Sequence, residues 1–422
     1  MRMKRFALIG AAVLLLLPMF TGCPGGREDR LVVWSFTDEI EDWIRMFNIG
    51  DAIGMPIEYS LTPTDQFPDR LTPALATGGA AAPDVFALES AFVRFYIESG
   101  LLLDLTDLYH EVRGRVLNYP VAIATHNGRV YGMSWQATPG AMFYRRSLAI
   151  RYFGTDDPAV IQQHFSNWDN FLLAARHIHD QSNGRTVTIS TLGDLTNPFM
   201  AARTQPWVVN GSLNIDPAVI RRMEMSRYLS ENGFEGRVTQ WSEGWFAGFR
   251  GELADELGPL GVFATFLPTW GLHFVLATNA PGTSGDWAMI PGPAPWFWGG
   301  TWLAAYRGTR QPDAAREFIR QITVNEDNLE AWARETGDLL NNMSVVNRIR
   351  DDFAMPFLGG QNHYAAFADM AVGIDGSLIQ GTDQAIDALF LEAVNQYANG
   401  ESTLDEALAM FRAQVSAQLN IN

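Results

Sequence analysis

In the first part of the chain, short apolar runs typical of strands alternate with segments in which apolar residues recur at helical spacing. Short apolar runs rich in β-favouring residues predict strands at 31–36, 56–61 and 83–88. Between them, apolar residues recur at helical spacing, and we expect helices over about 38–47, 67–76 and 91–98. A repeat of strand and helix is typical of a parallel sheet with helices on both faces.

The rest of the chain is more mixed and ends in helices. We expect strands at 130–135, 141–144, 186–190, 274–278, 287–290 and 301–306. An amphipathic helix should begin near Pro312, and another should end at Gly400. The last helix should start at a capping box formed by Thr403 and Glu406 and bury a stripe of apolar residues. These patterns predict an α/β protein with a helical C-terminal end.

The N-terminus has the features of an export signal. Basic residues precede a 15-residue apolar run at 6–20, which is too short for a spanning helix. The four residues 20–23 resemble a bacterial lipobox, in which the cysteine is lipidated. We therefore expect a signal peptide at 1–22, lipidation of Cys23, a tether at 23–30, and an exported protein anchored by lipid to the bacterial membrane. An ordinary signal peptide with an incidental cysteine is the alternative.

Composition excludes several classes of protein. The 422 residues carry a net charge of −17, so the basic footprint of a nucleic-acid binder is missing. Cys23 is the only cysteine and Lys4 the only lysine, which argues against cysteine-ligated metals, Schiff-base chemistry and a Walker lysine. His177 and His179 lie two apart in a helical pattern and point to different faces. We expect no cofactor, no metal and no enzymatic activity.

The tryptophans give the main positive indication of a function, which is the binding of a ligand. Many of the 13 tryptophans lie beside Gly, Pro or polar residues instead of inside apolar runs. A tryptophan at a strand end or in a loop offers a broad apolar face with little conformational entropy to lose, and the CH-rich faces of sugars stack on such rings. For any single tryptophan, packing in the core is the competing interpretation.

Several stretches together resemble one family. They are 31–36, 83–90, 127–135, 141–148, 285–293 and 299–304. In order and spacing, the chain is similar to the extracellular solute-binding proteins of ABC importers, specifically the sugar-binding family 1 type. The resemblance implies a two-lobed periplasmic-binding-protein-like α/β fold, each lobe a mostly parallel sheet flanked by helices, with strands crossing between the lobes. Applied to this sequence, the family's division into lobes implies that lobe one covers 31–138 plus 290–323 and that lobe two covers 139–289 plus 324–422.

In such a fold the ligand lies between the lobes, on loops that follow the strands. The resemblance implies that tryptophans stack on the ligand and that carboxylates and amides bind it by hydrogen bonds. The candidates expected on lobe one and its crossings are Trp34, Phe36, Asp38, Asp65, Gln66, Glu89, Trp135, Gln136, Trp298, Gly299 and Gly300. Those expected on lobe two are Tyr144, Trp207, Trp270, Gln361 and Asn362. For Asp38, Asp65 and Glu89, solvated acids or helix caps are the competing interpretation.

The leading hypothesis is a monomeric lipoprotein that captures a mono- or oligosaccharide and delivers it to the permease subunits of an ABC importer. A binding protein for a polyamine or another non-sugar solute fits the same acids and aromatic rings. A membrane-anchored carbohydrate-active enzyme, a hydrolase or lyase, would instead show two carboxylates in a groove. A purely adhesive surface lipoprotein would have no cleft.

Overall fold

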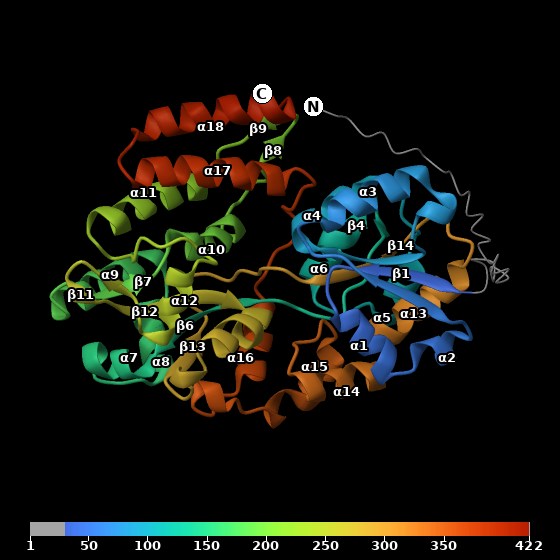
Figure 1. The fold of residues 1–422 in the computed structure, drawn as a ribbon, viewed down its shortest axis with the longest axis horizontal. Coiled ribbons are helices and arrows are strands. Elements are labelled where there is room, and N and C mark those ends of the chain that lie inside the picture. Colours follow the sequence, from blue (N-terminus) through green and yellow to red (C-terminus); the bar gives the residue numbers. More distant parts are fainter. Residues whose placement is uncertain (1–29, 422) are drawn as a thin grey trace, which may run out of the picture.

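The computed structural model describes residues 30–421. The predicted signal peptide, Cys23 and all of the tether except Arg30 lie outside the described residues. Two α/β lobes lie side by side (Figure 1), which confirms the expected fold class. Among the described residues, no helix has the length and apolar character needed to span a membrane.

The first lobe is built on a four-stranded sheet in the order β14-β3-β1-β2. Its strands are β1 (Leu31–Ser35), β2 (Ile57–Leu61), β3 (Val85–Glu89) and β14 (Thr301–Ala305). β1 runs parallel to β2 and β3, whereas β14 returns from the second lobe and pairs antiparallel with β3. The carboxyl ends of the three parallel strands therefore meet at one edge of the sheet.

Helices cover the first sheet, as the apolar periodicity predicts. They are α1 (Glu39–Met46), α2 (Ile49–Ile53), α3 (Phe67–Thr77), α4 (Ser90–Glu98), α5 (Thr106–Val112), α6 (Asn118–Ala124) and α13 (Pro312–Thr323). In α1, Ile40 and Trp43 are buried at i and i+3, so one face of the helix packs on the lobe and the other carries acids.

The second lobe is built on a sheet in the order β13-β6-β12-β7. Its strands are β6 (Gly140–Arg145), β7 (Thr186–Ile189), β12 (Gly261–Pro268) and β13 (Trp287–Ile290). Only β7 and β12 are parallel, and β6 runs antiparallel to both of its neighbours. This sheet is mixed because β6 enters directly from the first lobe and not through a helical crossover.

Helices also cover the second sheet. They are α7 (Arg146–Phe153), α8 (Pro158–His164), α9 (Trp168–Gln181), α10 (Thr196–Ala201), α11 (Pro217–Glu231), α12 (Glu243–Arg250) and α16 (His363–Ala371). The chain ends in α17 (Asp383–Ala398) and α18 (Leu404–Leu419), which pack against each other beside α11 (Figure 1). The predicted capping box of Thr403 and Glu406 starts α18.

Three two-stranded hairpins form small sheets that are separate from the two main sheets. They are β4 (Thr125–His126) with β5 (Arg129–Val130), β8 (Val208–Val209) with β9 (Ser212–Leu213), and β10 (Ala254–Asp255) with β11 (Gly258–Pro259). The strand expected at 130–135 shrinks to β5, and the residues after it extend toward the second lobe.

Two of the passages between the lobes run side by side and form a hinge. Segment 133–140 pairs with β14 at Met133 and then, near Pro139, with the returning segment 296–298. The backbone N–H of Gly140 donates to the carbonyl of Trp296 (2.8 Å), and a Cβ at Gly140 would lie 2.0 Å from the Trp296 ring. Only glycine therefore allows the two passages to lie this close.

Helices α14 (Glu326–Thr336) and α15 (Met343–Ile349) pack on the first lobe. The Trp332 ring of α14 stacks on Trp43 of α1, with centroids 4.5 Å apart, and the N–H of Met343 donates to the Arg115 carbonyl. The family resemblance assigned 324–422 to lobe two. We propose instead that lobe one extends to residue 349 and that the chain crosses back before α16.

One predicted strand is wrong. The segment expected to be extended at 274–278 lies in a π-helix over Gly271–Ala277 and the turn that follows it. Its buried residues Leu272, Val275 and Leu276 recur at i, i+3 and i+4, which is helical spacing. A short apolar run does not distinguish a strand from a buried helical turn, and here the buried positions follow the helical period.

Candidate functional site

A cavity of about 990 Å³ lies between the lobes. Its walls come from the carboxyl end of the first sheet, from the hinge and from loops of the second lobe. The lining residues are Phe36, Thr37, Asp38, Glu39, Asp42, Leu61, Thr64, Glu89, Gln136, Trp241, Trp270, His273, Phe274, Trp298, Gly299, Gly300, Thr301, Trp332, Thr336 and Asp338.

The lobe-one wall is polar because parallel strands end there. Residues 36–39 connect β1 to α1, Thr64 follows β2, and Glu89 ends β3. The Glu89 carboxylate also caps α4, accepting hydrogen bonds from the Ala91 N–H (2.6 Å) and the Ser90 hydroxyl (2.7 Å). Burial raises the pKa of Glu89.

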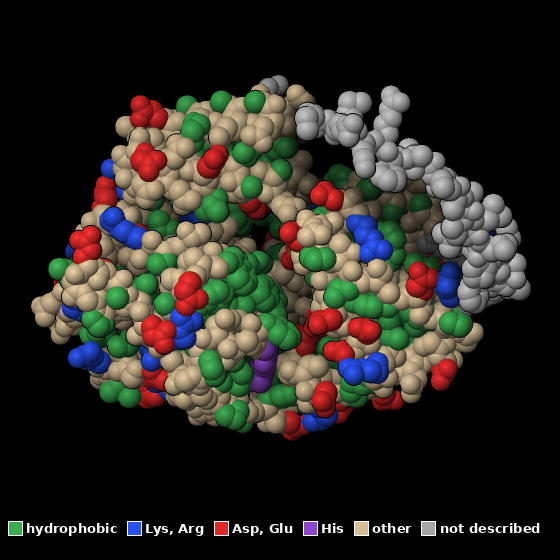
Figure 2. All heavy atoms as spheres, in the orientation of Figure 1, with side chains coloured by type: hydrophobic (Ala, Val, Ile, Leu, Met, Phe, Trp, Pro, Cys, Tyr) green, Lys and Arg blue, Asp and Glu red, His purple; other side chains and the backbone are tan. Residues whose placement is uncertain are grey.

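The lobe-two wall is aromatic. Trp241, before α12, and Trp270, after β12, lie parallel with an interplanar angle of 3° and centroids 6.3 Å apart. Trp298 stands nearly perpendicular to both, with centroids at 5.9 Å and 5.1 Å. Trp241 is half exposed and Phe274 is 65% exposed, so this wall offers apolar surface to a ligand. Figure 2 shows apolar side chains on one edge of the groove and acidic ones on the other.

The Trp270 ring is held in place by the hinge. Its indole N–H donates to the carbonyl of Trp298 at 2.9 Å. Gly299 has φ +78°, and a Cβ there would lie 2.6 Å from the Trp270 indole nitrogen. The glycine therefore allows the backbone to pass beneath the tryptophan.

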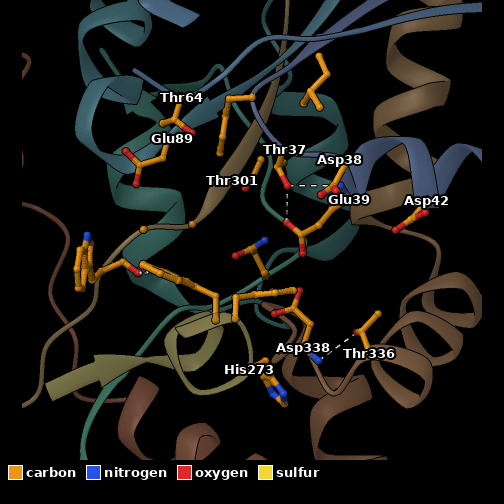
Figure 3. A pocket seen from close by; sticks show the side chains of 18 of the residues that line it. Thr37, Asp38, Glu39, Asp42, Thr64, Glu89, His273, Thr301, Thr336 and Asp338 are labelled. Atoms are coloured by element: carbon orange, nitrogen blue, oxygen red, sulfur yellow. Dashed lines mark hydrogen bonds between the residues drawn. The ribbon is translucent and has the colours of Figure 1, made fainter. Parts of the chain in front are cut away.

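Two carboxylates face each other across the cavity. Figure 3 shows Glu39, at the start of α1, and Asp338, after α14, turned toward one another. Burial, and then the charge of Asp338, raise the pKa of Glu39 to about 8. Burial raises the pKa of Asp338 to about 7, although the indole N–H of Trp135 donates to its Oδ2 at 3.1 Å.

His273 stands beside this pair on the π-helix. Burial lowers the pKa of His273, so its ring is neutral at pH 7. It lies against the buried ring of His363, with centroids 5.4 Å apart, and Gly337 lies close to both rings. Within residues 30–421, no three His, Cys, Asp or Glu side chains are grouped to hold a metal ion.

The cavity brings together half of the residues proposed from sequence. The candidates that line it are Phe36, Asp38, Glu89, Gln136, Trp270, Trp298, Gly299 and Gly300. Whether they bind a ligand stays a prediction.

Other candidates lie outside the cavity. The guanidinium of Arg70 covers the Trp34 ring at 3.8 Å from its centroid. Asp65 and Gln66 are exposed beyond Thr64, in the turn that leads into α3. Trp135 is fully buried and reaches the cavity only through its bond to Asp338.

The remaining candidates, all from lobe two, have structural roles. Tyr144 is buried in β6, and Trp207 is buried against α17, where its indole N–H donates to Asp387 (2.7 Å). The Gln361 side chain bonds both backbone groups of Met289, and Asn362 caps α16. These side chains pack in the core or bond to groups of the protein, and they do not line the cavity.

The sequence analysis missed several lining residues. Glu39 and Asp338 lie 299 positions apart, and only the packing of α14 on α1 makes them neighbours. Trp241 lies between the polar residues Gln240 and Ser242, and Trp270 is likewise flanked by polar or turn-forming residues. Trp241 was not proposed because no strand was expected before it.

Comparisons with known proteins agree with this fold. Residues 54–225 match the family model described as bacterial extracellular solute-binding protein. No curated protein matches the sequence.

Solved structures match nearly the whole chain. A structure described as extracellular solute-binding protein family 1 is 20% identical, with a TM-score of 0.79 over 90% of this chain and 97% of that one. The sugar-binding protein MalE from Xanthomonas citri is 15% identical, with a TM-score of 0.74 over 92% and 96%. An ABC transporter associated binding protein from B. animalis subsp. lactis Bl-04, in complex with beta-1,6-galactobiose, is 20% identical, with a TM-score of 0.69 over 92% and 96%.

At these identities the structures show the fold alone, and all three are described as binding proteins. Residues 54–225 are thus similar to the bacterial extracellular solute-binding protein family, and the two-lobed fold of the whole chain agrees with that similarity.

Proposed function

We propose that this protein captures a carbohydrate in the interlobe cavity and delivers it to the permease subunits of an ABC importer. The observation that carries the proposal is the wall formed by Trp241, Trp270 and Trp298 opposite a wall of carboxylates. Indole rings stack on the CH-rich face of a sugar, while carboxylate and amide groups hydrogen-bond its hydroxyls. A solved binding protein of the same fold, in complex with beta-1,6-galactobiose, supports the same ligand class.

Binding would proceed by closure of the lobes. The cavity takes residues from both lobes and from the hinge, so a ligand that touches both walls favours the conformation in which they lie close. We propose that the chain acts as an exported monomer, anchored through a lipid on Cys23 so that the solute is released next to the transporter.

The facing pair of Glu39 and Asp338 also favours a second candidate, a carbohydrate-active enzyme. Glycoside hydrolases place two carboxylates across the scissile bond and raise the pKa of the acid. The structural neighbours are described as binding proteins, which favours binding without cleavage.

A thermal-unfolding screen tests the proposal. The full-length chain, kept in a detergent without a sugar head group, is heated with mono- and oligosaccharides, polyamines or amino acids. A sugar present at 100 times its dissociation constant adds about 2.7 kcal/mol to the free energy of unfolding. A raised midpoint with intact sugar recovered supports the binding protein, and cleaved sugar supports the enzyme. A midpoint that no sugar raises contradicts both.

A further inference from the structure

The charge of the cavity lining is one-sided. Five of the lining residues are acidic and none is Lys or Arg. The acidic residues are Asp38, Glu39, Asp42, Glu89 and Asp338. The hydroxyls of a neutral sugar both donate and accept hydrogen bonds, so a site shaped for them alone needs donors as well as acceptors. This lining is rich in acceptors.

In the part of the chain that the structure describes, Asp42 is the one lining carboxylate of the five that forms an ion pair. Asp42 pairs with Arg45, and Glu89 caps α4. Among the described residues, neither Glu39 nor Asp338 forms an ion pair. Glu39 accepts a hydrogen bond from the Thr37 hydroxyl at 3.2 Å, and Asp338 accepts from Trp135. Neutral donors leave the negative charge of each group uncompensated.

The groups around the pair supply no positive charge. From α1 and its N-terminus, Asp38 and Asp42 add to the negative potential at Glu39. From α14, the Trp332 indole reaches Asp338 at 3.4 Å, and the Arg334 guanidinium is paired with Glu330 and Asp352.

The ionisable side chains that other elements place near the pair are neutral at pH 7. Burial raises the pKa of Tyr119 to about 12 and also raises that of Tyr364, so both phenols near Asp338 keep their protons. The π-helix contributes His273 and α16 contributes His363, and burial lowers the pKa of both. Two facing carboxylates in such surroundings favour a shared proton or a bound cation.

We propose that the solute is a carbohydrate that carries a protonated amine, with its ammonium group bound between Glu39 and Asp338 and its ring against Trp270 and Trp241. An ammonium group has three donors and no acceptor, which matches a wall of carboxylates. The tryptophan faces also attract a cation through their ring quadrupoles. This inference rests on the proposed function, because it places a sugar in the same cavity.

Matched sugar pairs test the inference by isothermal titration of the full-length chain. Glucosamine is compared with N-acetylglucosamine, and fully deacetylated chitobiose with chitobiose, at pH 6.5 in buffers of different ionisation enthalpy. One charge-assisted contact should make each amine bind roughly 10-fold to 100-fold tighter than its acetylated partner. The amine should also release protons from the carboxylate pair on binding, and the acetylated sugar should release fewer.

Two variants locate the preference. Glu39→Gln and Asp338→Asn keep the shape of the side chain and should each reduce the amine preference, the ratio of the dissociation constants of the acetylated sugar and the amine, about 10-fold. Glu41→Gln is the matched control, since Glu41 is exposed on the same helix and does not line the cavity. It should leave the preference as in the wild type. Thermal unfolding without ligand shows that each variant folds.

The outcomes separate this inference from the proposed function. Equal or tighter binding of the acetylated sugars by the wild type overturns the inference and leaves carbohydrate binding in place. Binding of spermidine with no binding of either sugar type overturns both. An amine preference that survives both variants also overturns the inference, because the ammonium group would then bind elsewhere.

Discussion

The tryptophans of this chain fall into two groups with different environments. Trp135, Trp207 and Trp245 are fully buried and donate their indole N–H to a carboxylate, so they support the lobes and the hinge. Trp241 is half exposed on the cavity wall and packs edge-on against buried Trp245, with centroids 5.1 Å apart. A loop-edge position in the sequence therefore corresponds to a cavity-lining tryptophan in some cases and to a buried one in others.

Trp241→Ala should weaken sugar binding without destabilising the protein. Loss of one stacking ring removes about 1 kcal/mol of binding free energy, or roughly a 5-fold to 10-fold increase in Kd. An exposed substitution changes the free energy of unfolding by about 0.5 kcal/mol or less. Isothermal titration and thermal unfolding measure the two effects. Leu257→Ala, at an 85% exposed position on the β10–β11 hairpin, is the control. Equal affinity for the Trp241 variant and the wild type would remove this ring from the site.

Glu39 should make the unliganded protein less stable at higher pH. Its pKa in the folded chain is about 8, above the ordinary 4.5, so the folded state binds more protons than the unfolded state between these values. The free energy of unfolding therefore falls as pH rises through this window. Glu39→Gln removes this pH-dependent contribution. The free energy of unfolding of the variant minus that of the wild type should therefore be about 1–2 kcal/mol larger at pH 8 than at pH 5.

Urea unfolding at pH 5 and pH 8 measures this difference. Glu41→Gln changes the same residue type on the exposed face of α1, and its effect should be the same at both pH values. A Glu39 variant that behaves like the Glu41 variant would show that the Glu39 carboxylate is solvated in the folded protein.

Elements contribute to the cavity mainly through their ends. Many of the lining residues follow β1, β2 or β12, begin α1, or lie on the hinge. The backbone of the hinge must pass close to Trp270, and Gly299 makes this possible. Elsewhere, Gly114 has nearly the same φ, +79°, but no atom lies within 4 Å of the position that a Cβ would take.

Comparing Gly299→Ala with Gly114→Ala separates backbone strain from steric contact. Both substitutions place alanine at positive φ, which costs about 1 kcal/mol. Only the Gly299 variant also displaces Trp270, so it should lose about 1–3 kcal/mol more in the free energy of unfolding and bind sugar about 10-fold more weakly. Chemical unfolding and titration measure both effects. Equal stability and affinity of the two variants would mean that Trp270 does not depend on this contact.

Local periodicity predicted most of the elements. The strands β1, β2, β3, β13 and β14 and the helices α4, α13, α17 and α18 lie where their apolar spacing indicated. The π-helix was missed because its apolar run is short. The eight predicted residues that do line the cavity follow strands or lie on the hinge, where topology alone places them. Glu39 and Asp338 could not be paired from sequence, because the packing of α14 on α1 depends on contacts between distant segments.

At the scale of the whole molecule, the two lobes present unlike surfaces to one cavity. The first lobe supplies the five acids, and the second lobe and the hinge supply the wall of Trp241, Trp270 and Trp298. We therefore expect the affinity for a ligand to depend on contact with both lobes at the same time. The hinge passages, held together by backbone hydrogen bonds and by Gly140, provide the pivot for such closure.

Hydrogen–deuterium exchange can show whether both lobes contact the ligand. The full-length chain is compared with and without the sugar that most raises its melting temperature. We expect slower exchange around Phe36–Asp42 on one lobe and around Trp241 and Trp270 on the other, with the hinge near Gly299 also protected. Protection confined to one lobe, or lying away from the cavity, would contradict this expectation.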